Sequence, residues 1–325
     1  MKPTIVVTTR LPGDPVKRLR AHDAGREAEI IHLDEPRTAT RQELLSAVPG
    51  ATAILSEIPD RIDEEVLEAA TDSLKIVANF GVGYDNIDVD AARERGIMIT
   101  NTPDVLTEST ADVAWLLMLM SARGALAANA DIREKRWNGW HPTTYIGADL
   151  VDKTLFIVGM GRIGLAVARR AIGWPMKVLY NARHPKPEAE AAPIHAKRVD
   201  LDEGLAQADF VSLHCPFTAE TKHLINATKL ALMKPGSILI NTARGPVVDE
   251  QALVDALENE TIHAAGLDVF EGEPRIHPGL LEHPRATLLP HIGSGSEQSR
   301  NGMTRIAVEN ILAVLSDQTP PNRVV

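Results

Sequence analysis

Short apolar runs alternate with longer amphipathic segments along most of the chain. The apolar runs hold many β-branched residues and do not alternate with polar positions, which is typical of parallel strands covered on both faces. Eight such runs predict strands, at residues 5–7, 53–55, 76–78, 155–158, 177–179, 210–213, 237–240 and 264–267. Segments with helical periodicity lie between them, at residues 63–70, 163–172 and 250–259. This alternation predicts an α/β fold with parallel sheets.

The strands and helices fall into two blocks. The first block ends near Asn101, and the second follows a long apolar helix predicted at residues 109–123 and ends near Pro290. A final helix, predicted at residues 296–315, has no strand after it and could return to pack on the first block. With about 150 residues per domain as a guide, a chain of 325 residues is expected to form two domains.

Composition and charge argue against several classes of protein. Hydrophobic residues make up 44% of the chain and charged residues 24%, as in ordinary globular proteins. The net charge is −10 and no basic stripe is present, so we expect no binding to nucleic acid. The most apolar stretch, residues 111–120, is well short of the roughly 20 residues of a membrane span, so we expect no membrane partner.

Targeting and redox signals favour a cytoplasmic protein. The apolar run after Met1 is too short for a signal peptide. Cys215 is the single cysteine, so a disulfide within one chain is impossible, which fits a reducing compartment. We expect no metal site, because four histidines lie in different elements without the spacing of metal ligands: His184, His195, His214 and His223.

Residues 129–149 are unusual in composition. They hold Trp137, Trp140 and Tyr145, although only 4% of the chain is aromatic. Two interpretations stay open: a loop that packs on its own domain, or an arm that reaches a partner subunit, because aromatic residues are enriched at interfaces. The second interpretation predicts a homodimer.

A glycine-rich turn lies between a predicted strand and a predicted apolar helix. It consists of Gly159, Met160, Gly161, Arg162, Ile163 and Gly164. In this context the pattern G-x-G-x-x-G predicts a dinucleotide-binding turn. The first glycine permits the tight turn, the second lets the pyrophosphate approach the backbone, and the third lets helix and strand pack closely. The helix N-terminus then offers N–H groups and a positive dipole to the phosphates.

The end of the following strand bears on the choice of cofactor. NAD-dependent proteins usually place an acidic residue there to bind the ribose 2′-OH, but residues 165–187 contain no Asp or Glu. Arg183 and Lys186 stand in that region instead, and a guanidinium can bind a 2′-phosphate through two hydrogen bonds. We therefore expect NADP(H) to be preferred and NAD(H) to be possible. The alternative is a solvated basic turn with relaxed specificity.

Three segments that follow apolar runs carry candidate chemistry. They are residues 241–245, 268–274 and 289–293. The carboxyl ends of strands are where open α/β sheets bind ligands. Hydride transfer to a ketone needs a proton donor for the developing alkoxide and a cation to hold a carboxylate-bearing substrate. His291 and Arg244 are residues of these types in these segments.

At these residues the chain resembles the D-isomer-specific 2-hydroxyacid dehydrogenase family, over essentially its whole length. The motifs that carry the resemblance are the glycine turn and residues 81–88, 241–245, 268–274 and 290–293. The glyoxylate/hydroxypyruvate reductase branch looks closest, because residues 101–107, residues 140–142 and the basic turn at Arg183 are similar to it.

The resemblance implies a role for each matching residue. His291 would be the general acid, and Glu273 would hydrogen-bond it and favour its protonated form. Arg244 would bind the substrate carboxylate and the carbonyl oxygen. The N–H groups of Val82 and Gly83 would complete the carboxylate cradle.

Further residues are expected to line the substrate pocket or the cofactor site. Glu57 and Ile58 follow the second predicted strand and could line the pocket, and Trp140 could cap it across a dimer interface. Asp268 would hold the nicotinamide carboxamide. The full set of expected cofactor contacts is Gly159, Gly161, Arg162, Ile163, Gly164, Asn181, Arg183, Lys186, Cys215, Pro216, Thr221, Thr242, Ala243, Asp268, His291, Gly293 and Ser294.

Two of these assignments have rivals nearby. Glu271 competes with Glu273 as the partner of His291, and the family pattern favours Glu273 because it directly precedes Pro274. Cys215 is interpreted as a pocket wall beside the cofactor rather than a nucleophile, because it has no plausible local base.

The expected architecture is two Rossmann-like doubly wound domains with a cleft between them. The substrate domain is discontinuous and flavodoxin-like, comprising residues 1–101 and 291–325, and residues 102–290 form the dinucleotide-binding domain. The predicted activity is NADPH-dependent reduction of glyoxylate or hydroxypyruvate to the D-2-hydroxy acid. A 2-ketogluconate or broad-specificity 2-oxo acid reductase is the enzymatic alternative. A nucleotide-sensing, protein-binding module is the alternative from another class.

Overall fold

The computed structural model describes every residue after Met1 and forms two compact units. Unit 1 comprises Met1–Leu106 and Gly295–Val325, and unit 2 comprises Thr107–Ser294. The chain therefore crosses between the units a few residues later than the predicted positions at Asn101 and Pro290. Residues 291–294, which the sequence placed with the substrate domain, belong to unit 2.

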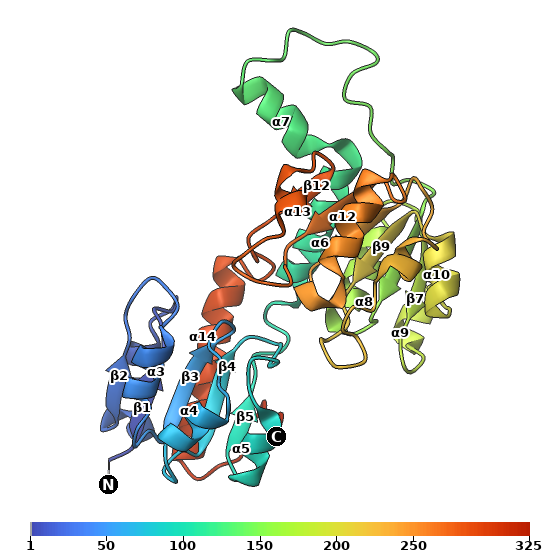
Figure 1. The fold of residues 1–325 in the computed structure, drawn as a ribbon. Helices are drawn as coiled ribbons and strands as arrows, with labels where there is room; N and C mark the ends of the chain where they lie inside the picture. The colour runs from blue at the N-terminus through green and yellow to red at the C-terminus, as the bar shows by residue number, and fades with distance from the viewer. Residues whose placement is uncertain (1) are drawn as a thin grey trace. The chain divides into compact units, whose positions relative to one another are not determined.

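Unit 1 contains one parallel sheet with helices on both faces (Figure 1). Its strands in chain order are β1 (Thr4–Val7), β2 (Glu29–His32), β3 (Ala53–Glu57), β4 (Ile76–Phe80) and β5 (Met98–Thr100). They lie in the order β2-β1-β3-β4-β5, and neighbouring strands are parallel. This is the strand order of the flavodoxin-like doubly wound fold, so the predicted fold class of this part of the chain is confirmed.

The helices of unit 1 cover its sheet. They are α1 (Pro15–Arg20), α2 (Asp23–Arg26), α3 (Arg41–Ala47), α4 (Glu64–Ala69), α5 (Val89–Glu94) and α14 (Glu297–Leu315). Because successive strand residues point to opposite faces, Val6, Ile54 and Val77 share one core with α3, α4 and α5. The last helix, α14, packs against β3 and β4 and against α1 and α2. Asn310 Nδ2 on this helix donates to the carbonyl of Asn101, so the end of the chain is tied back to the first block.

Unit 2 contains a parallel sheet of seven strands. They are β6 (Thr154–Val158), β7 (Lys177–Asn181), β8 (Lys197–Arg198), β9 (Phe210–Leu213), β10 (Ile238–Asn241), β11 (Ala264–Leu267) and β12 (Ala286–Leu288). Their order is β12-β11-β10-β9-β6-β7-β8. Read from β8, this is the Rossmann order 3-2-1-4-5-6 with one strand added at the far edge. The order reverses beside β6, which is the strand before the glycine turn.

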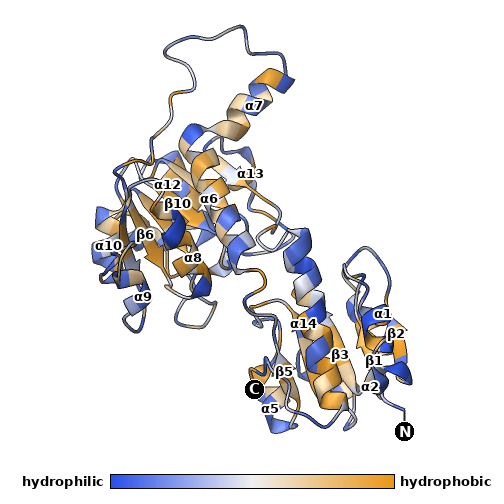
Figure 2. Ribbon diagram, turned by 180° about the vertical axis from the view of Figure 1, so that it is seen from behind, coloured by the Kyte–Doolittle hydropathy of each residue, from blue (hydrophilic) through white to orange (hydrophobic). Residues whose placement is uncertain are grey.

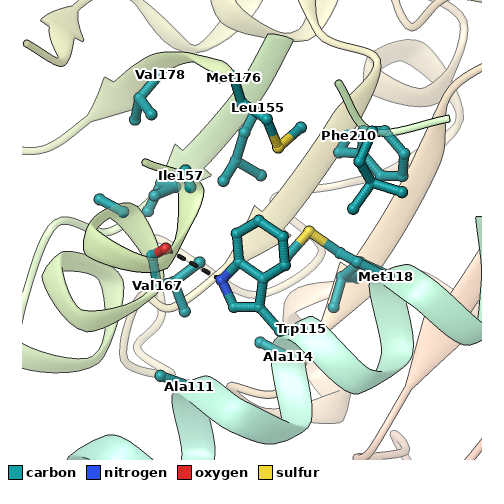
Figure 3. Close-up of a cluster of buried hydrophobic side chains, with 14 of the residues drawn as sticks. Ala111, Ala114, Trp115, Met118, Leu155, Ile157, Val167, Met176, Val178 and Phe210 are labelled. Atoms are coloured by element: carbon teal, nitrogen blue, oxygen red, sulfur yellow. Dashed lines mark hydrogen bonds between the residues drawn. The ribbon is translucent and has the colours of Figure 1, made fainter. Parts of the chain in front are cut away.

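The sheet of unit 2 has helices on both faces. The helices of this unit are α6 (Thr107–Arg123), α7 (Ala125–Arg133), α8 (Arg162–Ala171), α9 (Pro187–Glu190), α10 (Leu201–Gln207), α11 (Ala227–Leu230), the short 3-10 helix η1 (Gly245–Val247), α12 (Glu250–Glu258) and α13 (Pro278–Glu282). Helices α6 and α8 pack together on one face. Trp115 of α6 donates its indole N–H to the carbonyl of Val167 at 3.1 Å, so its polar group is satisfied within the core (Figure 3).

The hydropathy of the residues follows this layering. Figure 2 shows that the strands of both sheets are mostly hydrophobic, as expected for sheets covered on both faces. Among the described residues no single helix is long and apolar enough to cross a membrane. Helices α6 and α7 are long and apolar enough only when taken together, and they are bent by 68° relative to each other.

The pattern of apolar runs missed four strands, which are β2, β5, β8 and β12.

Candidate active site

The glycine turn has the geometry that a dinucleotide needs. Gly159 has φ +97°, and a Cβ there would lie 2.5 Å from the backbone nitrogen of Cys215. A Cβ on Gly164 would lie 2.3 Å from the carbonyl oxygen of Gly159, so helix α8 can approach β6 only with glycine at that position. A Cβ on Gly161 would meet nothing within 4 Å, so this glycine faces open space at the start of α8. The three glycines therefore match the turn, the approach of a pyrophosphate and the close packing of helix and strand.

The basic turn after β7 is held by a residue on the next strand. Arg198 of β8 donates from Nε to the carbonyl of Ala182 and from Nη2 to the carbonyl of Arg183, both at 3.1 Å. Asn181 Nδ2 donates to the carbonyl of Val199 at 3.1 Å. The side chain of Arg183 is exposed at this turn. These contacts fix the backbone that presents the Arg183 guanidinium to solvent.

An acidic residue from another loop also acts on this turn. The pKa of Glu220 is lowered by hydrogen bonds from Thr218 and from its own backbone, and further by the positive charge of Arg183. The carboxylate therefore lies within electrostatic range of the guanidinium. The acid-free interval of residues 165–187 could not reveal it, because Glu220 follows β9 rather than β7.

The end of β10 presents Arg244 through a tight local network. Asn241 accepts from the backbone nitrogen of Ala243 at 3.0 Å and donates to the carbonyl of Arg244 at 2.9 Å. Gly245 follows, and a Cβ there would lie 1.8 Å from the backbone carbon of Phe270. The segment that carries Arg244 is therefore in direct backbone contact with the segment after β11.

Asp268, at the end of β11, anchors the loop that carries His291. Its two carboxylate oxygens accept from the backbone nitrogens of Ile292 and Gly293, each at 2.7 Å. Burial raises the pKa of Asp268, and these two N–H groups oppose that rise. These two contacts clamp the segment that carries His291 to the end of β11. The predicted contact of Asp268 with a nicotinamide carboxamide would use the remaining lone pairs of the same oxygens, and it stays a prediction.

The side chains of His291 and Glu273 are in contact. The distance from His291 Nδ1 to Glu273 Oε2 is 2.9 Å. Since a carboxylate only accepts, Nδ1 carries the proton and Nε2 is the atom that can face a substrate. Burial would raise the pKa of Glu273, but the hydrogen bond and charge of His291, with Phe270 N–H and Arg244, outweigh it and leave that pKa below its usual value.

Glu271, the alternative partner considered for His291, contacts a different histidine. Glu271 Oε1 is 2.6 Å from Nε2 of His223, whereas Glu273 contacts His291. Arg244, Glu273 and His291 are thus gathered by three strand-end segments of unit 2, since the charge of Arg244 acts on Glu273.

The expected carboxylate cradle, Val82 and Gly83, lies in unit 1 after β4. Asn79 Nδ2 donates to the carbonyl of Gly83 at 2.7 Å, and Asn101 Nδ2 donates to the carbonyl of Val82 at 2.8 Å. A Cβ on Gly81 would lie 2.8 Å from the side chain of Ile58, so the β3 loop packs directly on the cradle backbone.

Glu57, beside Ile58, is one of two adjoining carboxyl groups. Burial raises the pKa of Glu57, and the charge of Asp60 adds to the rise. Asn86 Nδ2 donates to the carbonyls of both residues, at 3.1 and 2.9 Å, so the loop after β3 is fixed to the segment after β4. Unit 1 therefore brings together the Glu57, Ile58, Val82 and Gly83 positions predicted for substrate binding.

The remaining expected cofactor contacts cluster around the ends of β9 and β10. Thr242 Oγ1 lies 3.5 Å from His214 Nδ1, and Thr221 Oγ1 donates to the carbonyl of Pro216 at 2.8 Å. Burial lowers the pKa of His214 to about 3, so this imidazole is neutral. Burial also raises the pKa of Cys215 to about 11, and a thiol that stays protonated is a poor nucleophile. In the segment that Asp268 clamps, the carbonyl of Gly293 accepts from Thr110 Oγ1 at 3.2 Å, and Ser294 is the next residue.

Comparison with known proteins places the chain in a family. Residues 115–293 match the model described as D-isomer specific 2-hydroxyacid dehydrogenase, NAD binding domain. The chain is 45% identical over 328 aligned residues to the glyoxylate reductase of Thermococcus onnurineus, covering 100% of this chain and 96% of that relative. The chain belongs to the D-isomer-specific 2-hydroxyacid dehydrogenase family.

Solved structures of this family have the same fold. The glyoxylate reductase from Paecilomyes thermophila superposes with a TM-score of 0.89 at 36% identity, covering 99% of this chain and 98% of that one. The NADPH-dependent glyoxylate/hydroxypyruvate reductase from Sinorhizobium meliloti, in complex with NADP and malonate, superposes with a TM-score of 0.86 at 34% identity, covering 100% and 97% of the two chains. The present 2-hydroxyacid dehydrogenase is therefore an NAD(P)-dependent dehydrogenase, and the predicted family, fold class and enzyme class are confirmed.

The aromatic segment of this dehydrogenase projects from unit 2. Helix α7 has no buried residue, and Figure 1 shows it and the following loop extending away from the rest of the unit. Trp140 is 83% exposed, and Trp137 and Tyr145 are also exposed. The interpretation that this segment packs its aromatic residues on its own domain is therefore wrong. Among the described residues no group of three or more His, Cys, Asp or Glu side chains could hold a metal ion.

Proposed function

We propose that this dehydrogenase reduces a small 2-oxo acid, glyoxylate or hydroxypyruvate, to the D-2-hydroxy acid and prefers NADPH. The observation that carries the proposal is the grouping of Arg244, Glu273 and His291 at the strand ends of the dinucleotide-binding unit. The glyoxylate reductase of Thermococcus onnurineus and the NADPH-dependent reductase of Sinorhizobium meliloti support the choice of substrate and cofactor.

In the proposed mechanism the site residues bind the carboxylate of the substrate and protonate its carbonyl oxygen. Arg244 binds the carboxylate and polarises the carbonyl, since a guanidinium matches two oxygen acceptors at once. The N–H groups of Val82 and Gly83 are proposed as further donors to the substrate carboxylate. His291 gives its Nε2 proton to the carbonyl oxygen as the C–O double bond is reduced, and Glu273 stabilises the imidazolium before that transfer. When bound, the reduced nicotinamide supplies the hydride.

The cofactor is expected to lie along the glycine turn of β6 and α8. The second glycine leaves room for the pyrophosphate, and the start of α8 offers N–H groups to it. Asn181, Arg183 and Lys186 would surround the ribose, with Arg183 on a 2′-phosphate. Contacts from Thr221, Thr242 and Cys215 would position the rest of the dinucleotide.

The test is a steady-state comparison of glyoxylate, hydroxypyruvate, pyruvate and 2-ketogluconate, each with NADPH and NADH. The proposal expects the highest kcat/KM with glyoxylate or hydroxypyruvate and NADPH. A maximum with 2-ketogluconate, or equal rates with all four acids, would favour the alternative reductase. Tight cofactor binding without turnover of any 2-oxo acid would favour a nucleotide-sensing module.

Arg183→Ala tests the cofactor preference. We expect the KM for NADPH to rise roughly 10- to 100-fold, because hydrogen bonds to a charged phosphate are lost, while the KM for NADH changes little. Lys177→Ala is the matched control, since Lys177 is also exposed and lies at the other end of β7. Equal effects on both cofactors would rule out the phosphate assignment.

We also propose that residues 129–149 form a dimerisation arm and that Trp140 caps the substrate pocket of the partner. Trp140, Trp137 and Ile146 are large hydrophobic side chains that the arm leaves exposed, and aromatic residues are enriched at protein interfaces. We expect Trp140→Ala to lose roughly tenfold in selectivity for glyoxylate over larger 2-oxo acids.

Ratios of kcat/KM, measured with sedimentation velocity on the same samples, check the Trp140 prediction. Leu281→Ala is the control, because Leu281 is an exposed hydrophobic residue outside the arm. Unchanged selectivity in Trp140→Ala would contradict the capping role, and a monomeric wild-type protein would contradict the arm.

A further inference from the structure

A second histidine–glutamate pair lies two residues from Glu273. The Nε2 of His223 donates to Glu271 Oε1 at 2.6 Å, and its Nδ1 lies 3.9 Å from Asp249 Oδ2. The backbone nitrogen of Glu271 donates to Glu250 Oε1, also at 2.6 Å. Glu271 is therefore fixed through both its side chain and its backbone, at a point next to the carboxylate that contacts the proposed general acid.

The backbone of His223 bonds to a different segment of the site. Its N–H donates to the carbonyl of Pro246 at 2.8 Å, and Ile225 N–H donates to the carbonyl of Val247 at 3.1 Å. Pro246 and Val247 belong to η1, which begins directly after Arg244. His223 has φ +49°, in the left-handed region. A residue other than glycine keeps that conformation only where its surroundings hold it there.

His223 thus bonds to the two segments that present Arg244 and Glu273. Those segments also touch directly, since a Cβ on Gly245 would lie 1.8 Å from the backbone of Phe270. We infer that His223 is a positioning residue: with Glu271 as its partner, it holds the segment of Glu273 in register with the segment of Arg244. This inference rests on the proposed function, in which those two side chains act together on one substrate.

The charges around His223 favour a hydrogen-bond donor at this position. Burial raises the pKa of Glu250, and the charge of Glu271 adds to the rise, so these two carboxyl groups crowd each other. Asp249 is a third acidic group beside the imidazole. The N–H of His223 donates to Glu271 and so offsets part of the repulsion among these carboxylates. Since His223 and Glu271 are both partly exposed, their pair adds little to overall stability, and its effect lies in the placement of the loop.

The experiment compares variants on each side of the pair. His223→Asn keeps a residue that tolerates positive φ but removes the imidazole, and Glu271→Ala removes the acceptor. We expect each to lower kcat about tenfold, because a small misplacement of a catalytic group is costly. The dissociation constant of NADPH for Glu271→Ala, from quenching of nucleotide fluorescence, should stay unchanged. Glu271→Gln retains an acceptor oxygen and should restore most of the kcat.

The matched control is His195→Asn, because His195 also has a positive φ, +52°, and is exposed before β8. If the pair acts as a unit, the double variant His223→Asn/Glu271→Ala should lose no more kcat than the worse single variant. Wild-type kcat in both single variants would overturn the inference, and so would a loss in Glu271→Gln equal to that in Glu271→Ala. A wild-type protein that reduces no 2-oxo acid would overturn the proposed function instead.

Discussion

Replacing His291 with asparagine is expected to lower kcat for glyoxylate reduction by about 10²- to 10⁴-fold, the usual contribution of a positioned general acid. The imidazole has its Nδ1 side held by Glu273, so the proton that reaches the substrate must come from Nε2, and an amide cannot supply it. Steady-state kcat and the dissociation constant of NADPH are the measurements. The dissociation constant should change far less than kcat, since the main loss concerns the proton.

Asparagine is the informative substitution because His291 has φ +53°. Alanine would strain the backbone there, whereas asparagine tolerates this conformation, so the Asp268 clamp on Ile292 and Gly293 should persist. His195→Asn again serves as the control for removing a histidine of positive φ. A kcat near that of the wild type in His291→Asn would show that the proton comes from another group.

The central strands could be predicted from the sequence because they are apolar on both faces. The four strands that the sequence missed all lie at sheet edges, and none is longer than four residues. Strand β8 is two exposed basic residues, Lys197–Arg198, and β2, Glu29–His32, begins with an exposed glutamate. Neither leaves an apolar run, so only the pairing with a neighbouring strand identifies them.

The site could be predicted where each residue belongs to a strand-end motif. What the sequence could not reveal are bonds between loops distant along the chain. Arg198 shapes the Arg183 turn from a strand that has no sequence signal, and His223 reaches Glu271 across 48 positions. The clamp of Asp268 on Gly293 likewise spans 25 positions, so no local motif reveals it.

Arg244→Ala is expected to lower kcat/KM for glyoxylate by about 10³-fold, the upper range for removing one preorganised donor from a developing oxyanion. Both kcat and KM should worsen, because the guanidinium both binds the carboxylate and polarises the carbonyl. Asn241 and Gly245 hold the backbone at this position independently of the side chain. The fold should therefore survive, and thermal unfolding should confirm that it does.

Two further variants separate charge from geometry at this position. Arg244→Lys keeps the charge but presents a single point rather than two parallel donors, so we expect it to recover only part of the lost kcat/KM. Arg275→Ala is the matched control, since Arg275 is an exposed arginine of the neighbouring loop. Free guanidinium added to Arg244→Ala should raise its rate and leave Arg275→Ala unchanged. Full activity in Arg244→Lys would mean that charge alone suffices, and full activity in Arg244→Ala would remove this arginine from the mechanism.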